Sequence, residues 1–227
     1  IGAALADLKR RIAAAEQLWG RAPGTVALLA VSKTRPPGDV REAHRWGQAA
    51  FGESRVQEAL AKQAALSDLA LDWHFIGPLQ SNKTRAVAEH FQWVHSVDRA
   101  ELARRLSRQR PTQLGPLEVC VQVNISGEAS KSGVAPPAAL ALCETVAALP
   151  GLRLRGLMAV PAPAPDPAAR RSAFRNLHEL WESVRAAGIP LDTLSAGMTA
   201  DLEAAIAEGS TLVRVGTAIF GPRPPAA

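Results

Sequence analysis

The chain has five lysines, and Lys33 is the one that directly follows an apolar run, Val26–Val31, and a serine. Its amine would sit at the end of a buried strand. Partial loss of water there disfavours the charged form and leaves some of the amine neutral and nucleophilic. Such an amine can form a Schiff base with a carbonyl compound. Taken alone, a surface lysine at a strand end is an equally good interpretation.

Two later segments combine glycine and hydroxyl side chains directly after apolar runs. One contains Ser195, Gly197, Met198 and Thr199 and leads into a helical pattern from Asp201, and the other is Gly216-Thr217. Backbone N–H groups and hydroxyls at the start of a helix bind anions. Each segment alone could be a plain helix cap, but the pair predicts a phosphate site.

Three further residues lie near the same predicted strand ends. Arg214 stands between Val213 and Val215, and a guanidinium only donates hydrogen bonds. If Arg214 points inward, it could face a pyridine nitrogen and keep that nitrogen unprotonated; a structural ion pair is the alternative. Met158 ends the sixth apolar run. His74 is expected to order a loop, because no second histidine shares a metal-like spacing with it.

The elements that must position these residues alternate between short apolar runs and longer amphipathic runs, after a first helix over Ala3–Trp19. Predicted strands are Val26–Val31, Ala49–Phe51, Trp73–Ile76, Trp93–Ser96, Leu117–Asn124, Arg153–Met158, Thr193–Ser195 and Leu212–Val215. Predicted helices are Asp39–Trp46, Val56–Leu66, Lys83–His90, Arg99–Gln109, Pro137–Ala148, Ala168–Ala187 and Ala200–Glu208.

Eight β/α units predict an α/β fold, a single (β/α)8 barrel with an extra N-terminal helix, in one domain over residues 1–227. A doubly wound open sheet is the main rival, although no dinucleotide fingerprint follows the first strand. In a barrel the strand ends converge on one mouth, and phosphate commonly binds after strands seven and eight. The Pro-rich run Pro161–Pro167 would be a semi-rigid lid edge or a spacer.

Composition narrows the classes of function. The chain is 47% hydrophobic and 21% charged, with a net charge of +5, which is typical of a soluble globular protein. Basic residues are densest over Arg99–Arg110, but Leu102 and Leu106 make that run an amphipathic helix, so no nucleic acid partner is expected. No apolar run is long enough for a membrane span, and a cytoplasmic location is expected. Cys120 and Cys143 are expected to be buried free thiols.

Several runs together resemble the pyridoxal phosphate homeostasis protein family. The resemblance implies a barrel like the N-terminal domain of alanine racemase, a Schiff base between pyridoxal 5′-phosphate (PLP) and Lys33, phosphate contacts at Ser195–Thr199 and Gly216-Thr217, and a pyridine-facing Arg214. The family's FGEN motif reads FGES here, with Ser54 in place of asparagine, so a side-chain contact at that position is in doubt. The runs are Ala30–Thr34, Phe51–Glu58, Trp73–Lys83, Ser130–Gly133, Arg155–Met158, Leu194–Met198, Asp201–Gly209 and Val213–Gly221.

The resemblance implies a protein that holds PLP, takes part in vitamin B6 homeostasis and could deliver the cofactor to apoenzymes, without established turnover. A monomer is expected, although the sequence does not determine the oligomeric state. A racemase-type enzyme is the alternative, but alanine racemases use a tyrosine as second base, and this chain contains no tyrosine and ends soon after the eighth strand. A Schiff-base aldolase acting on a sugar phosphate would use the same lysine and phosphate loops. The sequence does not identify the apoenzymes.

Overall fold

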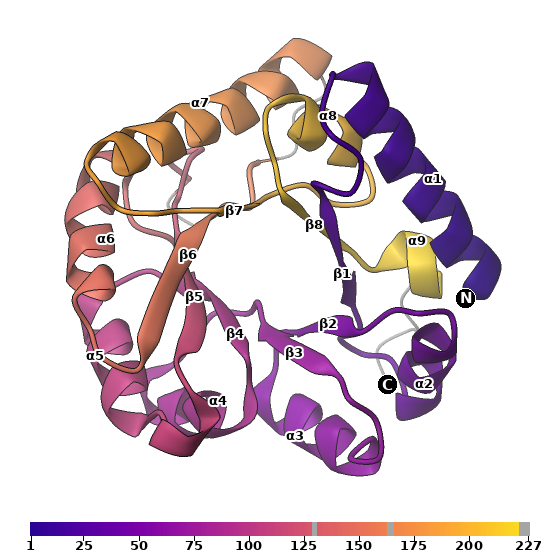
Figure 1. The fold of residues 1–227 in the computed structure, drawn as a ribbon, viewed down its shortest axis with the longest axis horizontal. Coiled ribbons are helices and arrows are strands. Elements are labelled where there is room, and N and C mark those ends of the chain that lie inside the picture. Colours follow the sequence, from indigo (N-terminus) through magenta and orange to yellow (C-terminus); the bar gives the residue numbers. More distant parts are fainter. Residues whose placement is uncertain (129–130, 163–165, 223–227) are drawn as a thin grey trace.

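Eight parallel strands pair in sequence order, and β8 pairs with β1 to close a barrel (Figure 1). The computed structural model describes residues 1–128, 131–162 and 166–222. The strands are β1 Ala27–Val31, β2 Ala50–Glu53, β3 Asp72–Phe75, β4 Trp93–Val97, β5 Leu117–Gln122, β6 Leu152–Met158, β7 Thr193–Ser195 and β8 Leu212–Val215. The barrel prediction is confirmed, and the open-sheet alternative is wrong.

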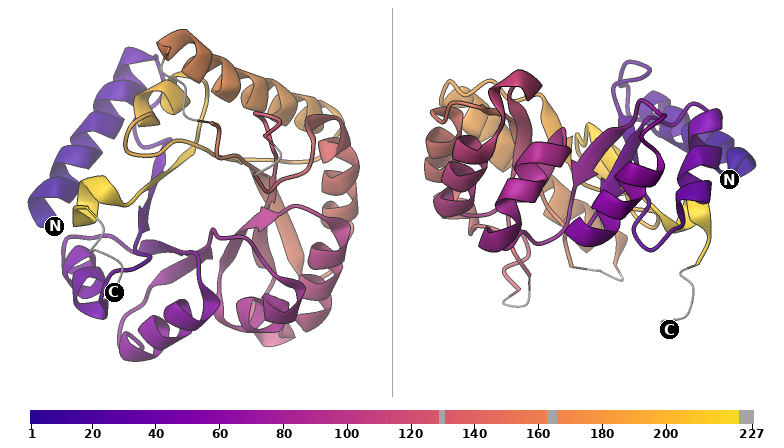
Figure 2. Two further views of the ribbon diagram at one scale, coloured as in Figure 1. Left: turned by 180° about the vertical axis from the view of Figure 1, so that it is seen from behind. Right: turned by 90° about the horizontal axis from the view of Figure 1, so that it is seen from below.

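The helices form a ring around the strands, as the views from behind and from the side show (Figure 2). The predicted extra helix, α1, lies on the outside of the barrel beside α8 and α9. Short 3-10 turns occur at Ser81–Lys83, Thr112–Leu114 and Pro136–Ala138. The α-helices are α1 Gly2–Leu18, α2 Pro37–Arg45, α3 Val56–Ala65, α4 Thr84–His90, α5 Ala100–Gln109, α6 Ala139–Ala147, α7 Pro167–Ala186, α8 Leu202–Ala207 and α9 Thr217–Phe220.

Most element bounds lie within one or two residues of the predicted ones, and three differences from the prediction are near the site. The fifth strand ends at Gln122, because Asn124 Nδ2 donates to Glu128 O in the following loop. The helix predicted from Ala200 begins at Leu202, since the Asp201 carboxylate accepts from Met198 N, 2.6 Å away, and closes a turn first. Helix α9 was not predicted, because it is only four residues long. Of the Pro161–Pro167 run, residues 163–165 lie outside the described part.

Burial in the core explains why the strands appear in the sequence as apolar runs. Parallel strands buried on both faces carry apolar residues in succession, and Phe51, Phe75 and Leu157 are almost fully buried in them. Leu102 and Leu106 face this core from α5, as predicted. Cys120 and Cys143 are buried free thiols, also as predicted, and burial raises the pKa of both.

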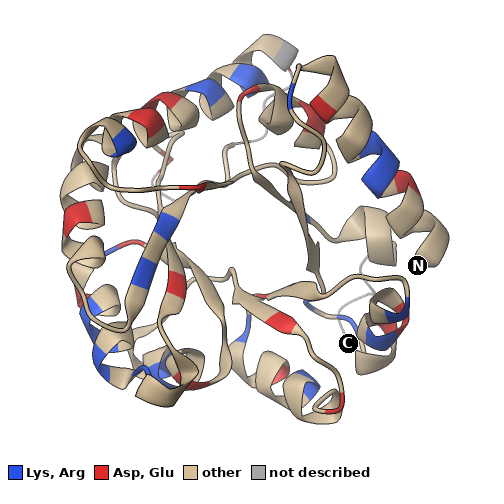
Figure 3. Ribbon diagram, in the orientation of Figure 1, with Lys and Arg blue, Asp and Glu red and all other residues tan. Residues whose placement is uncertain are grey.

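The surface carries charges of both signs. Acidic and basic residues are interspersed along the outer helices, while β6 carries two arginines near one end of the barrel (Figure 3). None of the described helices has both the length and the apolar character that crossing a membrane requires.

Candidate functional site

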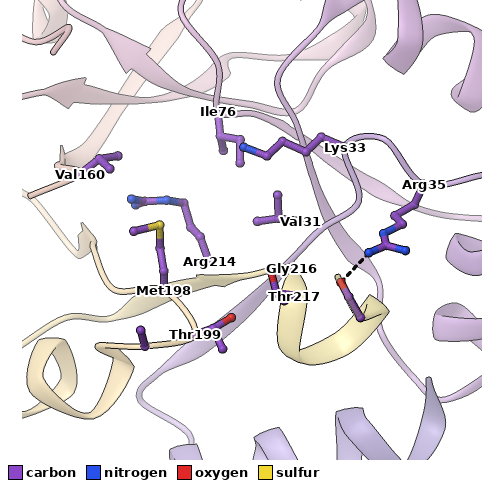
Figure 4. A pocket seen from close by; sticks show the side chains of 12 residues that line it. Val31, Lys33, Arg35, Ile76, Val160, Met198, Thr199, Arg214, Gly216 and Thr217 are labelled. Carbon is purple, nitrogen blue, oxygen red and sulfur yellow. Dashed lines mark hydrogen bonds between the residues drawn. The ribbon is translucent and has the colours of Figure 1, made fainter. Parts of the chain in front are cut away.

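A pocket of about 320 Å³ lies at the carboxyl ends of the strands, between β1 and β8 and the loops after β3, β6 and β7 (Figure 4). Three of its side chains are cationic: Lys33, Arg35 and Arg214. The pocket would therefore attract an anion. It is lined by Val31, Lys33, Arg35, Ile76, Val160, Met198, Thr199, Ala200, Arg214, Gly216, Thr217 and Gly221.

Most of the residues predicted from the sequence meet in this lining. They come from three separate segments of the chain, and the barrel brings them together because all the strands end on one side. Met158, Ser195 and Gly197 do not line it and lie buried beneath it. The predicted residues that do line it are Lys33, Met198, Thr199, Arg214, Gly216 and Thr217.

Lys33 follows β1 in a turn that is held from below by Lys62. The Lys62 side chain is only 3% exposed, and its Nζ donates to Ser32 O at 2.8 Å and to Glu53 Oε1 at 2.6 Å. The Ser32 hydroxyl donates to the same carboxylate oxygen at 2.6 Å. The residue before Lys33 is thus fixed through both its side chain and its carbonyl.

The residue after Lys33 is held in an unusual conformation. Thr34 has φ of +65°, in the left-handed region that β-branched residues avoid. Its N–H donates to Glu58 Oε1 at 2.5 Å, and Lys62 Nζ donates to the same oxygen at 3.2 Å. We call Glu53, Glu58 and Lys62 the clamp. The clamp orients the backbone of Lys33 toward the pocket. It could not be predicted from the sequence, because its members lie on other elements, β2 and α3.

The clamp leaves one buried oxygen without a partner. Glu53 is fully buried, and among the described residues its Oε2 accepts no hydrogen bond. Burial raises the pKa of the Glu53 carboxyl, and the nearby Lys62 ammonium only partly opposes this. A carboxyl next to the lysine turn is thus biased toward its protonated form.

The two predicted phosphate loops face the pocket with unused donors. Within the described residues, the N–H groups of Thr199 and Ala200 in one loop, and of Thr217 in the other, make no hydrogen bond. The hydroxyls of Thr199 and Thr217 stand beside them (Figure 4). The Met198 N–H is taken by Asp201, so Met198 contributes its side chain to the wall instead.

Gly197 allows the first of these loops to pack closely on α8. Its φ is +96°, and a Cβ there would lie 2.6 Å from Ala205 Cβ. A side chain would therefore push the loop away from the helix.

Arg214 points into the barrel, an orientation that the sequence allowed but did not determine. Its Nη1 donates to Ser195 O at 2.6 Å and to Ser195 Oγ at 2.7 Å, and its Nη2 donates to Ala159 O at 2.9 Å. No ion pair holds it among the described side chains. Burial lowers the pKa of the guanidinium to about 10, so it stays charged at neutral pH. The alternative of a structural ion pair is thus wrong.

The structure corrects the prediction for His74 and shows where Ser54 lies. His74 does not order a loop: it lies within β3, 3% exposed, and bonds to His95 inside the barrel. Its partner His95 lies on β4, which a sequence spacing could not indicate. Ser54, at the position where asparagine was expected, lies outside the lining of the Lys33 pocket. Its backbone oxygen instead packs against Gly77, where a Cβ would approach within 2.3 Å.

The candidate site also has a residue that the sequence did not suggest. Arg35, two positions after Lys33, extends across the pocket rim and donates to Gly221 O and Pro222 O (Figure 4). It joins the β1 loop to the segment after α9. Its position in the same loop as Lys33 is the one signal that could have found it.

Comparisons with known proteins show the family and the fold of this chain. The pattern of the family described as "Alanine racemase, N-terminal domain" matches residues 4–224. A pyridoxal phosphate homeostasis protein of Pseudomonas aeruginosa is 61% identical over 219 residues, which cover 96% of this chain and 94% of that protein. The structure of PipY of Synechococcus elongatus with PLP bound has a TM-score of 0.81 and 40% identity, covering 92% of this chain and 100% of that one. The structure of PipY without PLP has a TM-score of 0.86, at 39% identity over 97% of this chain and 100% of that one.

Proposed function

This chain belongs to the pyridoxal phosphate homeostasis protein family, and we propose that it binds PLP in the pocket at the barrel mouth through a covalent bond to Lys33. The observation that carries the proposal is the set of groups in one pocket. An amine, a buried guanidinium and two loops with unused N–H groups match the aldehyde, the pyridine nitrogen and the phosphate of PLP.

Each group of the pocket has a defined task in this proposal. The Lys33 amine would bind the aldehyde carbon as a Schiff base, with release of one water molecule, and this linkage would give the cofactor its visible absorption. The hydroxyls and N–H groups of Thr199 and Thr217 hold the phosphate, and Arg214 donates toward the ring nitrogen. Met158, Ser195 and Gly197 act from behind the lining: Ser195 holds Arg214, and Gly197 lets the phosphate loop approach.

The function that follows is storage and handling of PLP, in line with the name and ligand of the relatives. We further propose that the chain acts as a monomer in the cytoplasm and can release PLP to apoenzymes. Racemase-type turnover is not part of the proposal, because the sequence has no tyrosine to serve as a second base.

An absorption spectrum with borohydride trapping tests the proposal. Purified protein mixed with PLP should show a visible band that borohydride removes, and peptide mapping should find the reduced adduct on Lys33. Lys33→Ala should lose both signals. Lys83→Ala is the matched control, because Lys83 lies at the rim of a different pocket, and it should keep both. A colourless protein that forms a borohydride adduct with a sugar phosphate would instead indicate the aldolase. A label carried wholly by another lysine would refute the proposal.

A further inference from the structure

An unbroken chain of hydrogen bonds crosses the interior of the barrel from the carboxylate of Asp72 to Arg214. His74 Nε2 lies 3.1 Å from Asp72 Oδ2, and His74 Nδ1 lies 2.9 Å from His95 Nε2. His95 Nδ1 lies 2.9 Å from Ser195 Oγ, which in turn accepts from Arg214 Nη1 at 2.7 Å. We call Asp72, His74, His95 and Ser195 the relay. It joins β3 and β4 to β7 and β8.

The two ends of the relay, together with one proton on each imidazole ring, set the direction of every bond in it. Arg214 can only donate, so Ser195 Oγ accepts from it and turns its own hydrogen toward His95 Nδ1. A deprotonated Asp72 can only accept, so His74 donates from Nε2. His74 Nδ1 is then an acceptor, and His95 donates to it from Nε2. With a single proton on each ring, both histidines carry it on Nε2, and all donors point from Arg214 toward Asp72.

Burial agrees with this assignment. His95 and Ser195 are 0% exposed and His74 is 3% exposed, whereas 41% of the Asp72 side chain is exposed. Burial is the main cause that holds the pKa of His95 well below its ordinary range, so its ring is neutral. The relay thus has a buried interior and a single carboxylate end that reaches solvent.

The relay determines whether the Ser195 hydroxyl presents its oxygen or its hydrogen to Arg214. Without an acceptor at His95 Nδ1, the hydroxyl hydrogen could turn toward the guanidinium and oppose it. With that acceptor in place, Ser195 Oγ and Ser195 O take up both hydrogens of Arg214 Nη1, and Ala159 O takes one from Nη2. A guanidinium has five N–H donors, and the described residues accept hydrogen bonds from three of them in Arg214, whose side chain lines the pocket.

We propose that Asp72, His74, His95 and Ser195 are positioning residues that fix the donor direction of Arg214, so that the ring nitrogen of bound PLP stays an unprotonated acceptor. The proposal rests on the function proposed above, because it concerns PLP in the Lys33 pocket. It assigns a role in cofactor tuning to Asp72, a residue at the amino end of β3 and outside the pocket lining.

The first test does not need the cofactor. Nitrogen-15 NMR of the full chain with labelled histidine reports the tautomer of each ring. We expect His74 and His95 to carry the proton on Nε2 and to be neutral at pH 7. A proton on Nδ1 of either ring, or a charged His95, would overturn the proposal while leaving PLP binding untouched.

The second test breaks the relay at its far end. In Asp72→Ala, His74 loses the acceptor that fixes its tautomer, so the His95 signals should report a mixture of tautomers. Asp68→Ala is the matched control, because Asp68 forms its ion pair with Arg41 on the surface, and its His74 and His95 signals should match those of wild type. Unchanged His95 signals in Asp72→Ala would overturn the relay.

The third test breaks the relay next to Arg214. Ser195→Ala should weaken PLP binding about tenfold, since it removes a hydrogen bond to a charged group. It should also make the visible band of bound PLP depend on pH across the neutral range. Ser210→Ala is the matched control: Ser210 is a similarly buried serine whose hydroxyl contacts, among the described residues, the carbonyls of Leu194, Ala196 and Leu212 alone. If both variants keep the wild-type pH profile, the proposed role is wrong. Loss of the band in wild type would contradict the proposed function instead.

Discussion

Lys62 Nζ lies 2.6 Å from Glu53 Oε1, and both side chains are buried directly behind the turn that carries Lys33. Two charges in such a place are costly to remove from water, and their mutual attraction only roughly balances that cost. The pair is therefore poorly suited to raising stability. It instead orders the Ser32 and Thr34 backbone on both sides of the cofactor lysine, which favours a role in preorganising the site.

Removing one partner of this pair should be costly. Lys62→Met leaves the Glu53 carboxyl buried without its counter-ion, and we expect the free energy of unfolding to fall by about 3 to 5 kcal/mol. The double variant Lys62→Met with Glu53→Leu should recover most of that loss. Urea unfolding measures both, with Lys9→Met at an exposed position of α1 as control. A loss below about 1 kcal/mol in the single variant would show that the pair is not tightly coupled to folding.

The raised pKa of Glu53 predicts a pH dependence of stability. The folded protein keeps a proton on Glu53 at pH values where the unfolded chain has released it. The stability from this group is therefore present at low pH and falls as pH rises from about 4.3, the ordinary glutamate pKa, to the raised value. Glu53→Gln cannot titrate. We expect the unfolding free energy of wild type minus that of Glu53→Gln to decrease over this window in urea titrations. A rise would mean that Lys62 outweighs burial.

The two phosphate loops predict that the protein binds PLP much more tightly than pyridoxal, which lacks the phosphate group. Charge-assisted hydrogen bonds from several fixed donors contribute about 1.5 to 3 kcal/mol each, so pyridoxal should bind far more weakly than PLP. Absorbance titration with both compounds measures the ratio. Thr217→Val should reduce the affinity for PLP and leave that for pyridoxal nearly unchanged. Equal affinity of the wild-type protein for both compounds would exclude the phosphate site proposed at Thr199 and Thr217.

Alanine substitutions at two glycines with nearly the same positive φ distinguish the cost of backbone strain from the cost of close packing. Gly197 and Gly188 have φ of +96° and +91°, so alanine at either costs about 1 to 2 kcal/mol of backbone strain. Only at Gly197 would the new Cβ meet Ala205, 2.6 Å away, while nothing lies within 4 Å at Gly188. Gly197→Ala should therefore be the less stable variant and should bind PLP more weakly. Equal unfolding free energies and equal affinities would show that the loop can move without cost.

Amino-acid turnover should be absent or marginal. Racemisation needs a base on each face of the α-carbon and a ring that accepts the resulting charge. Lys33 provides one base, the sequence has no tyrosine, and Arg214 beside the ring nitrogen would disfavour its protonation. The assay incubates the protein with single-enantiomer alanine or serine in deuterated water and follows enantiomer ratio and α-deuterium.

The turnover assay has a clear control. Rapid inversion that disappears in Lys33→Ala would make the protein a racemase and overturn the carrier function. Slow exchange of the α-proton without inversion would agree with a reactive cofactor held on Lys33 and would leave the proposed function in place.

The sequence by itself determined the barrel and the principal groups of the candidate site. Alternation of apolar and amphipathic runs is a local property, and eight parallel units place all strand ends on one side. Lys33, Thr199, Arg214 and Thr217 could therefore be assigned to one mouth without knowing any contact between them.

Only the tertiary structure decided how these groups are supported. His95 and Ser195 lie 100 residues apart and meet across the barrel interior, and Lys62 reaches the Ser32 carbonyl 30 residues away. Such contacts depend on closure of the barrel and on side-chain rotamers, which leave no periodic signal in the chain. This is why His74 was misplaced in a loop and the clamp was missed. The ends of the strands determine where the site residues come together, and the side chains packed beneath them determine the direction in which each donor points.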